Sequence, residues 1–368
     1  MVVDTSPRLI PVTLLTGFLG SGKTTLLNHL VQQPEMADTL VIINEFGEVS
    51  LDHLLIAHST ENLVLEMNSG CVCCTIRGDL VKTLRDITWR FSRNGDRQFK
   101  RVLIETTGLA DPAPIIHTLM THPQIAARYR LDGIVATVDA QLGWGTLDQH
   151  REAVKQAAVA DVILLTKTDL APPEQVQRLE DRLTAINPAA VRWHTDHGHI
   201  APHQVLDLGL FSGTREKPDV TRWLKESAYQ PLSPFKPSLS PLAAPRLSAT
   251  AYPEDVNRHD DHIRAFCFVV DEPIPDEVLT LWLEILTSFA GRDILRVKGI
   301  LNIEGRELPV VLHGVQHIFH PPITLPAWPS EDRRSRIVFI THDVEPEVVD
   351  QAFTSLRQIL DDPRFASI

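Results

Sequence analysis

The sequence predicts an α/β protein with a mostly parallel sheet covered by helices on both faces, followed by a smaller α+β domain. Short, continuously apolar runs alternate with amphipathic stretches from residue 9 to about 210. A Pro- and Ser-rich segment follows, and a new pattern of strands and helices begins at Ile263. Parallel strands need helical crossovers and are buried on both faces, so they appear in a sequence as continuous apolar runs separated by helices.

The alternating runs of the first part predict individual strands and helices. The expected strands are residues 10–16, 39–45, 100–107, 133–140 and 161–169, and a helix is expected at residues 24–33. Because the carboxyl ends of parallel strands lie at one edge of a sheet, we expect the loops after these strands to form the ligand site.

A change in composition divides the chain. Proline and serine recur in residues 212–262 without apolar periodicity, which predicts a linker between a first domain, 1–211, and a C-terminal α+β domain, 263–368. The expected C-terminal elements are strands at 263–270, around 294–303, at 308–315 and at 336–342, and helices at 276–290 and 345–360.

Bulk composition excludes several classes of protein. The chain has 368 residues, more than one comfortable core, of which 43% are hydrophobic and 22% charged, as in an ordinary globular protein. A net charge of -12 without a basic patch argues against binding to nucleic acid. The first apolar run has no basic segment or cleavage site before it, so we expect a core strand, no membrane association and a cytoplasmic location.

A glycine-rich loop predicts phosphate binding. Residues 17–24, GFLGSGKT, match G-x-x-x-x-G-K-[ST] between an expected strand and an expected helix. Glycines let backbone N–H groups surround phosphate oxygens, and a helix N-terminus favours anionic charge. The expected nucleotide-binding residues are Gly17, Gly20, Ser21, Gly22, Lys23, Thr24 and Thr25, with Lys23 on the β- and γ-phosphates and Thr24 on Mg²⁺. The alternative is a glycine turn that only caps a structural helix.

The segment KRVLIETTGLADP predicts two further catalytic positions. Glu105 ends an apolar strand, and Gly108 follows three residues later. An enzyme with a phosphate loop needs an acid near the Mg²⁺ ion and a mobile glycine that senses the γ-phosphate. We therefore expect Lys23, Glu105 and Gly108 to be catalytic, with Glu105 bound to magnesium through water. A solvated carboxylate at a strand end is the alternative.

The segment DVILLTKTDL resembles the N-K-x-D guanine motif. It places Thr166, Lys167 and Asp169 at a strand end. The two oxygens of Asp169 can accept hydrogen bonds from guanine N1–H and the exocyclic amine, whereas adenine would leave the carboxylate poorly paired, so GTP is expected over ATP. Thr166 stands where asparagine is usual, and its shorter side chain cannot span the same hydrogen bonds. A plain surface turn is the alternative.

A cysteine cluster predicts a transition-metal site. Cys71, Cys73 and Cys74 lie within GCVCC and account for three of the four cysteines. Soft thiolates suit Zn²⁺, Co²⁺ or Cu(I), and three ligands would leave one position open for transfer. Two thiolates completed by Glu45, Glu48, a histidine or water remain an alternative, as do a redox pair and buried structural thiols. Five other histidines are expected to be solvated loop residues: His194, His197, His199, His259 and His262.

The ordered set GFLGSGKTT, NEFGE, GCVCC, ETTGLADP and TKTD closely resembles the CobW-type GTPases, relatives of the urease and hydrogenase nickel-insertion GTPases. The resemblance covers most of the chain, including the smaller C-terminal domain. The family's C-x-C-C motif maps onto Cys71, Cys73 and Cys74, and its E-x-x-G segment onto Glu105 and Gly108. The resemblance implies slow GTP hydrolysis coupled to delivery of a divalent metal to a client.

The expected function is therefore that of a GTP-hydrolysing metallochaperone that uses GTP, Mg²⁺ and Zn²⁺ or Co²⁺. A client metalloprotein is the expected partner, contacted partly through the C-terminal domain, and binding of GTP with Mg²⁺ is expected to change metal affinity. Two alternatives from other classes stay open: a small-molecule phosphotransferase with a phosphate loop, and a regulatory protein that senses nucleotide and zinc.

Overall fold

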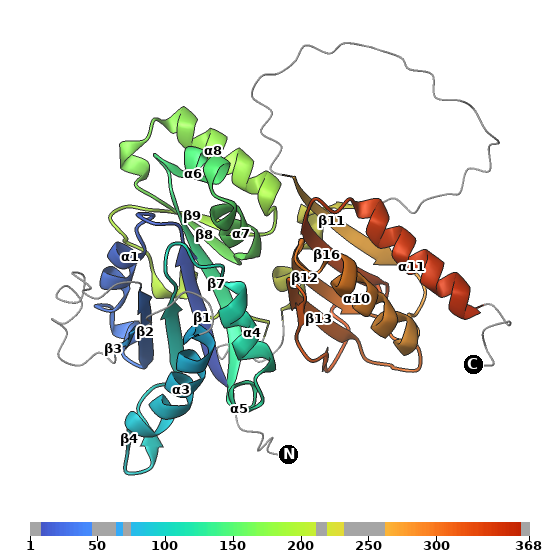
Figure 1. Cartoon of the computed structure of the whole chain (residues 1–368), viewed down its shortest axis with the longest axis horizontal. Helices are drawn as coiled ribbons and strands as arrows, with labels where there is room; N and C mark the ends of the chain where they lie inside the picture. The colour runs from blue at the N-terminus through green and yellow to red at the C-terminus, as the bar shows by residue number, and fades with distance from the viewer. Residues whose placement is uncertain (1–8, 46–63, 69–74, 211–218, 232–261, 362–368) are drawn as a thin grey trace.

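The structure, a computed structural model, describes residues 9–45, 64–68, 75–210, 219–231 and 262–361. Two seven-stranded sheets with their helices lie side by side in Figure 1. The first sheet has the order β3-β2-β6-β1-β7-β8-β9, and all its strand pairs are parallel. The predicted α/β fold with a smaller α+β domain after it is confirmed.

The parallel sheet and its helices span residues 10 to 195. Its strands are β1 (Ile10–Gly17), β2 (Thr39–Glu45), β3 (Val64–Asn68), β6 (Arg101–Glu105), β7 (Tyr129–Asp139), β8 (Val162–Thr166) and β9 (Val191–Thr195). Its helices are α1 (Lys23–Leu30), α3 (Thr75–Arg90), α4 (Ala113–Thr121), α5 (Pro123–Ala126), α6 (Gly143–Gln149), α7 (Arg151–Val159) and α8 (Pro173–Ile186). The edge strands β3 and β9 contain charged and polar residues, so continuous apolar runs did not predict them.

Both faces of the parallel sheet are buried. Successive side chains of a strand point to opposite faces. Val12 and Leu14 of β1 join the core that contains α3, α4 and α7, whereas Leu15 joins a smaller core with residues of α1. This two-sided burial is the reason that apolar side chains point to both faces of β1.

The second sheet is largely antiparallel and has the order β10-β11-β16-β12-β13-β14, with β15 paired to β13. Its elements are β10 (Gln230–Pro231), β11 (Ile263–Val270), β12 (Ile294–Leu301), β13 (Val310–Val315), β14 (Ile318–Phe319), β15 (Ile323–Thr324), β16 (Ser335–His342), α10 (Asp276–Ala290) and α11 (Pro346–Asp361). Helices α10 and α11 cover one face of this sheet (Figure 1). There Trp282 packs edge-on against Phe353 at a ring distance of 5.2 Å and against Phe339 at 6.0 Å.

The other face of the second sheet packs against the first domain. Val154 of α7 and Val338 of β16 belong to the same buried cluster. At this interface Asp161 Oδ1 accepts hydrogen bonds from Arg296 Nη2 at 2.5 Å and from Lys298 Nζ at 2.8 Å. The apolar contacts and these buried ion pairs join the two domains.

Part of the segment predicted as a linker is folded. Residues 219–231 contain α9 (Val220–Leu224), a 3₁₀ turn (Glu226–Ala228) and β10, which pairs in parallel with β11. Trp223 is buried, and Lys298 Nζ lies 5.0 Å from the centre of its ring. Composition alone did not predict this, because the burial of the short VTRWL helix depends on the neighbouring domain. Among the described residues, no helix combines the length and the apolar character needed to cross a bilayer.

Candidate nucleotide site

The glycine loop after β1 has a backbone that side chains would obstruct. Gly17, Gly20 and Gly22 have φ angles of 142°, 71° and 91°, in the region that favours glycine. A Cβ atom at Gly17 would also overlap Thr137 Oγ1 on the neighbouring strand β7. The loop therefore needs glycine at these positions to turn from β1 into α1.

Lys23 lies inside this loop at the first turn of α1. Its side-chain Nζ donates hydrogen bonds to the carbonyl oxygens of Gly17 at 2.8 Å and Phe18 at 3.0 Å, and the residue is only 8% exposed. Thr24 follows it half-buried and Thr25 exposed. A lysine cation and a helix N-terminus at one point form a site for anionic groups.

The glycine loop is tied to the two strands on one side of it. Ser21 Oγ and Thr137 Oγ1 lie 2.6 Å apart, and Thr166 Oγ1 donates a hydrogen bond to the Ser21 carbonyl at 2.8 Å. Thr166 is 5% exposed. The shorter side chain at this position thus bonds to the phosphate loop instead of extending toward a base.

Lys167 makes a second connection to the loop. Its Nζ donates to the Gly20 carbonyl at 2.8 Å and pairs with Asp139 Oδ2 at 2.7 Å. The other oxygen of Asp139 accepts the backbone N–H groups of Gln141 and Leu142. Asp139 was not a predicted site residue, although it ends strand β7 just as Glu105 ends β6, and that shared position is the signal that could have identified it.

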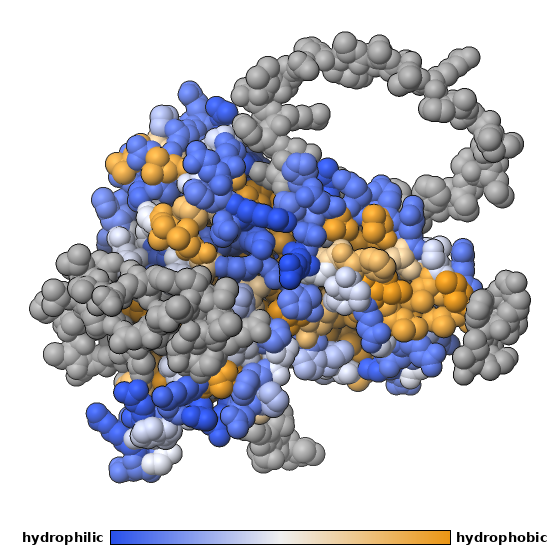
Figure 2. Space-filling view, in the orientation of Figure 1, coloured by the Kyte–Doolittle hydropathy of each residue, from blue (hydrophilic) through white to orange (hydrophobic). Residues whose placement is uncertain are grey.

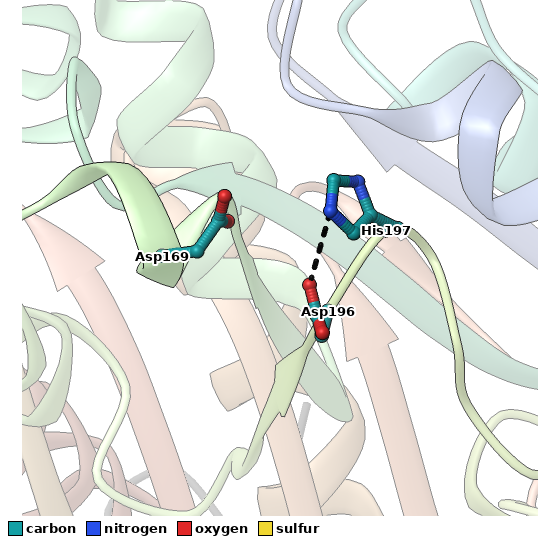
Figure 3. A group of neighbouring side chains, drawn as sticks. All are labelled: Asp169, Asp196 and His197. Carbon is teal, nitrogen blue, oxygen red and sulfur yellow. Dashed lines mark ion pairs between the residues drawn. The ribbon is translucent and has the colours of Figure 1, made fainter.

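Asp169 lies beside two residues of another loop (Figure 3). It belongs to the 3₁₀ turn after β8, whereas Asp196 and His197 follow β9. The side-chain ligand atoms of the three residues lie within 4.8 Å of one another, and His197 Nε2 is 3.5 Å from Asp196 Oδ1. His197 is 76% and Asp196 74% exposed, so His197 is a solvated loop histidine, but its position beside Asp169 was not predicted because β9 was missed.

Glu105 and Gly108 lie on the other side of the loop. Glu105 ends β6, pairs in register with Leu15 of β1 and is 7% exposed. A Cβ atom at Gly108 would be 2.6 Å from the backbone nitrogen of Leu19, so the loop after β6 lies directly against the phosphate loop. The structure therefore brings Lys23, Glu105 and Gly108 to one edge of the sheet, as predicted for strand ends.

The predicted transition-metal ligands fall mostly outside the described residues. Cys71, Cys73, Cys74 and Glu48 lie there, and for Glu45 the structure gives only its place at the end of β2, in register with Asn68 of β3. The remaining cysteine, Cys267 of β11, is 5% exposed, and burial raises the pKa of its thiol to about 11. Cys267 is thus protonated at neutral pH, and it belongs to the buried apolar cluster between the domains.

The other histidines singled out from the sequence contact protein groups. His194 Nε2 lies 2.9 Å from Glu180 Oε1, and His262 Nδ1 lies 2.8 Å from Asp343 Oδ1. The rings of His199 and His29 meet edge-on at 4.2 Å. His259 lies outside the described residues.

Comparison with known proteins places this site in a family. The family profile described as CobW/HypB/UreG, nucleotide-binding domain, matches residues 11–192. The profile described as cobalamin synthesis protein cobW C-terminal domain matches residues 263–357. The two matches coincide with the parallel sheet and the second sheet.

Individual relatives extend over nearly the whole chain. The zinc chaperone YjiA of Escherichia coli is 35% identical over 349 residues, which cover 95% of this chain and 99% of the relative. The zinc-regulated GTPase metalloprotein activator 1 of Dictyostelium discoideum is 26% identical over 391 residues, covering 90% and 76%. The crystal structure of Zn(II)-bound YjiA GTPase from E. coli matches with a TM-score of 0.63 at 30% identity, covering 95% of this chain and 99% of that one. The chain is therefore a member of the CobW family of GTPases.

Proposed function

We propose that this GTPase is a metallochaperone that binds a divalent transition metal, zinc or cobalt, through Cys71, Cys73 and Cys74 and delivers it to a client protein. The observation that carries the proposal is the order of its parts along the chain and across the sheet. The phosphate loop with Lys23 lies at the sheet edge where β3 ends, and the segment with the three cysteines joins β3 to α3. The names of the relatives, zinc chaperones and a zinc-regulated activator, support the same function.

In this proposal the glycine loop binds the phosphates of GTP. Backbone N–H groups of the loop and Lys23 Nζ would contact the β- and γ-phosphates, and the burial of this cation inside the loop supports that role. Thr24 in the first turn of α1 and Glu105 at the end of β6 would hold Mg²⁺, because hydroxyl and carboxylate oxygens are the hard ligands that this ion prefers. When bound, Mg²⁺ would neutralise charge on the phosphates.

Guanine would bind at the other end of the site. Asp169 is exposed beside the loop after β9 and can accept both hydrogen bonds that guanine offers. Thr166 and Lys167 would hold the strand end in place, since both bond to carbonyl oxygens of the phosphate loop. The backbone of Gly108 would contact the γ-phosphate, the group that hydrolysis removes.

Nucleotide state and metal affinity would be coupled over a short distance. Strand β3 is separated from β1 by β2 and β6, so it lies three strand spacings away. At about 4.8 Å per spacing this is roughly 14 Å along the sheet. Ordering of the strand ends by GTP would thus reach the thiolates, and hydrolysis would release the metal.

The C-terminal domain, which we propose spans residues 263–368 after the first domain and linker, would make part of the client contact. Apolar side chains gather over α10 and α11 in Figure 2. Phe289 is 88%, Ile359 50% and Leu281 39% exposed. Exposed apolar patches on a soluble protein frequently mark sites of protein association.

Metal titrations test this proposal. Affinity for Zn²⁺ and for Co²⁺ would be measured with a non-hydrolysable GTP analogue and with GDP. We expect different affinities in the two states for the wild-type protein, loss of tight binding in Cys73→Ser, and no change in the control Cys267→Ala, which removes the buried thiol of β11. Equal metal affinities with both nucleotides would refute the proposed coupling.

Hydrolysis assays distinguish the alternative functions. A phosphotransferase would consume nucleotide only with a second acceptor and would keep its turnover in Cys73→Ser. A regulatory protein would hydrolyse GTP without changing the metal content of any client. We expect neither result, and we expect Lys23→Ala to abolish hydrolysis, because the buried ammonium group is the cation of the phosphate loop.

A further inference from the structure

Helix α7 holds the loop that follows β6. Lys155 Nζ donates a hydrogen bond to Asp111 Oδ2 at 3.0 Å. One residue later, Gln156 Nε2 donates to the carbonyl oxygens of Gly108 at 3.3 Å and Ala110 at 3.1 Å. Both the backbone and the carboxylate of the 108–111 loop are therefore bonded to one helix.

The C-terminal domain reaches the same carboxylate. Gln316 lies in the turn between β13 and β14, is 8% exposed, and its Nε2 donates to Asp111 Oδ2 at 3.0 Å. Burial alone would raise the pKa of Asp111, but hydrogen bonds from the Ala113 N–H, Lys155 and Gln316 hold it below its usual value. Asp111 is thus an ionised acceptor shared by the two domains.

Two further contacts fix the C-terminal domain to both ends of α7. Arg151 Nη2, at the first residue of the helix, donates to Asp293 Oδ1 at 3.2 Å. Asp161, two residues after the helix ends, binds Arg296 and Lys298. A displacement of the C-terminal domain would therefore act on α7 as well as on Gln316.

The 108–111 loop and α7 both contact the phosphate loop. A Cβ atom at Gly108 would be 2.6 Å from the Leu19 nitrogen, so the two loops are in van der Waals contact. The ring of His150, directly before α7, stacks on Phe18 of the phosphate loop at 4.3 Å. The 108–111 loop thus connects Gln316, bonded to Asp111, with the phosphate loop, which Gly108 touches.

We infer that Gln316 of the C-terminal domain positions the 108–111 loop and thereby sets how strongly the protein prefers GTP over GDP. The inference rests on the proposed contact of Gly108 with the γ-phosphate. GDP has no γ-phosphate, so its affinity should not depend on Gln316. By linkage, a client that displaces the C-terminal domain would change GTP affinity, and GTP would change client affinity by the same factor.

The test compares two ligands in the full-length chain. Dissociation constants for GDP and for a non-hydrolysable GTP analogue with Mg²⁺ would be measured for wild type and Gln316→Ala. A hydrogen bond to a charged, partly exposed group predicts a loss of about three- to tenfold for the GTP analogue, with GDP affinity within about twofold of wild type. The control Gln351→Ala makes the same substitution at an exposed position of α11 and should change neither affinity.

A second variant replaces the hydrogen bond by charge repulsion and keeps the size of the side chain. Gln316→Glu places a carboxylate beside Asp111 and should reduce the affinity for the GTP analogue more than Gln316→Ala does. Adding Asp111→Asn should recover part of that loss, because the Asn amide can donate to Glu at position 316. Steady-state hydrolysis should show the same order, with a raised KM for GTP in both single variants.

The outcomes separate this inference from the proposed function. An unchanged ratio of GTP to GDP affinity in both Gln316 variants, or an equal loss for both ligands, would overturn the positioning role while leaving hydrolysis by the wild-type protein intact. Failure of the proposed function would instead appear in the wild type, as absence of GTP binding or as hydrolysis that survives Lys23→Ala. Thermal unfolding of each variant shows which losses of affinity come from a destabilised fold. For a destabilised variant, recovery of GTP-analogue affinity by Asp111→Asn then decides whether the positioning role holds.

Discussion

The ion cluster between the two domains makes a quantitative prediction for Asp161→Asn. The side chains of Asp161, Arg296 and Lys298 are 14%, 4% and 9% exposed. Burial by itself would raise the pKa of Asp161, but the two cations hold it well below its usual value. Asparagine keeps an acceptor for the Ile134 N–H, which Asp161 Oδ2 binds at 3.0 Å, so the substitution removes mainly the charge.

The magnitude follows from the two cations that remain. Removing one partner of a buried ion pair destabilises a protein by about 3–5 kcal/mol. The lower end is expected here, because burial, together with Arg296, already lowers the pKa of Lys298 to about 8. The variant also lacks the Asp161 carboxylate, which raises the pKa of Lys298, so that pKa falls further, and release of the proton relieves part of the repulsion. We expect Asp161→Asn to lower the free energy of unfolding by about 3 kcal/mol.

The assay is urea unfolding followed by tryptophan fluorescence, to which Trp223 contributes from its place beside Lys298. Asp38→Asn is the control, since its ion pair with Lys100 is 2.5 Å long but the two side chains are 54% and 79% exposed. A surface pair of this kind contributes less than about 1 kcal/mol. Equal effects of the two substitutions would refute the reasoning. The double variant Asp161→Asn, Lys298→Met should regain part of the loss, because it also removes one unpaired cation.

Three further predictions concern the interface and the phosphate loop. Burial lowers the pKa of Lys298 to about 8, so the unfolded state binds more protons than the folded state between about pH 8 and 10.5. The free energy of unfolding of the wild type should therefore rise with pH across that window relative to Lys298→Met. Parallel pH profiles of the two proteins would contradict this. Gly17→Ala should abolish detectable binding of GDP and GTP in a fluorescence titration, because its Cβ would overlap Thr137 Oγ1 at a φ of 142°. Thr166→Val removes the buried 2.8 Å hydrogen bond to the Ser21 carbonyl and should weaken nucleotide binding about tenfold, as measured by calorimetry. Unchanged affinity would show that this hydrogen bond to the phosphate loop is dispensable.

Local patterns were sufficient to predict the parallel sheet and the phosphate half of the site. Strand β2 has the bounds predicted from its sequence, residues 39–45. The spacing of Gly17, Gly22 and Lys23 determines a loop whose geometry depends on neighbouring residues of the same segment. The convergence of Glu105 with this loop also followed from sequence, because strand ends of a parallel sheet share one edge.

The base end of the site was predicted only in part. Asp169 was identified, but the position of Asp196 and His197 beside it was not, because β9 is a polar edge strand and gave no apolar signal. The bond of Thr166 to the phosphate loop was not predicted either. The hydroxyl of threonine reaches the Ser21 carbonyl only because β8 lies two strands from β1 and its end meets the loop there.

The sequence by itself determined that this chain has a phosphate loop, an acid at the right strand end and a second domain, since each depends on residues close together along the chain. Only the tertiary structure decided how the domains meet. Asp111 and Gln316 are 205 residues apart, and Asp161 and Lys298 are 137 apart. Asp111 belongs to the ETTGLADP segment, but no motif indicates that it pairs with Gln316 or that Asp161 pairs with Lys298. Their contact depends on the packing of one sheet face against α7, and the desolvation that makes the charges strong arises only once that packing has formed.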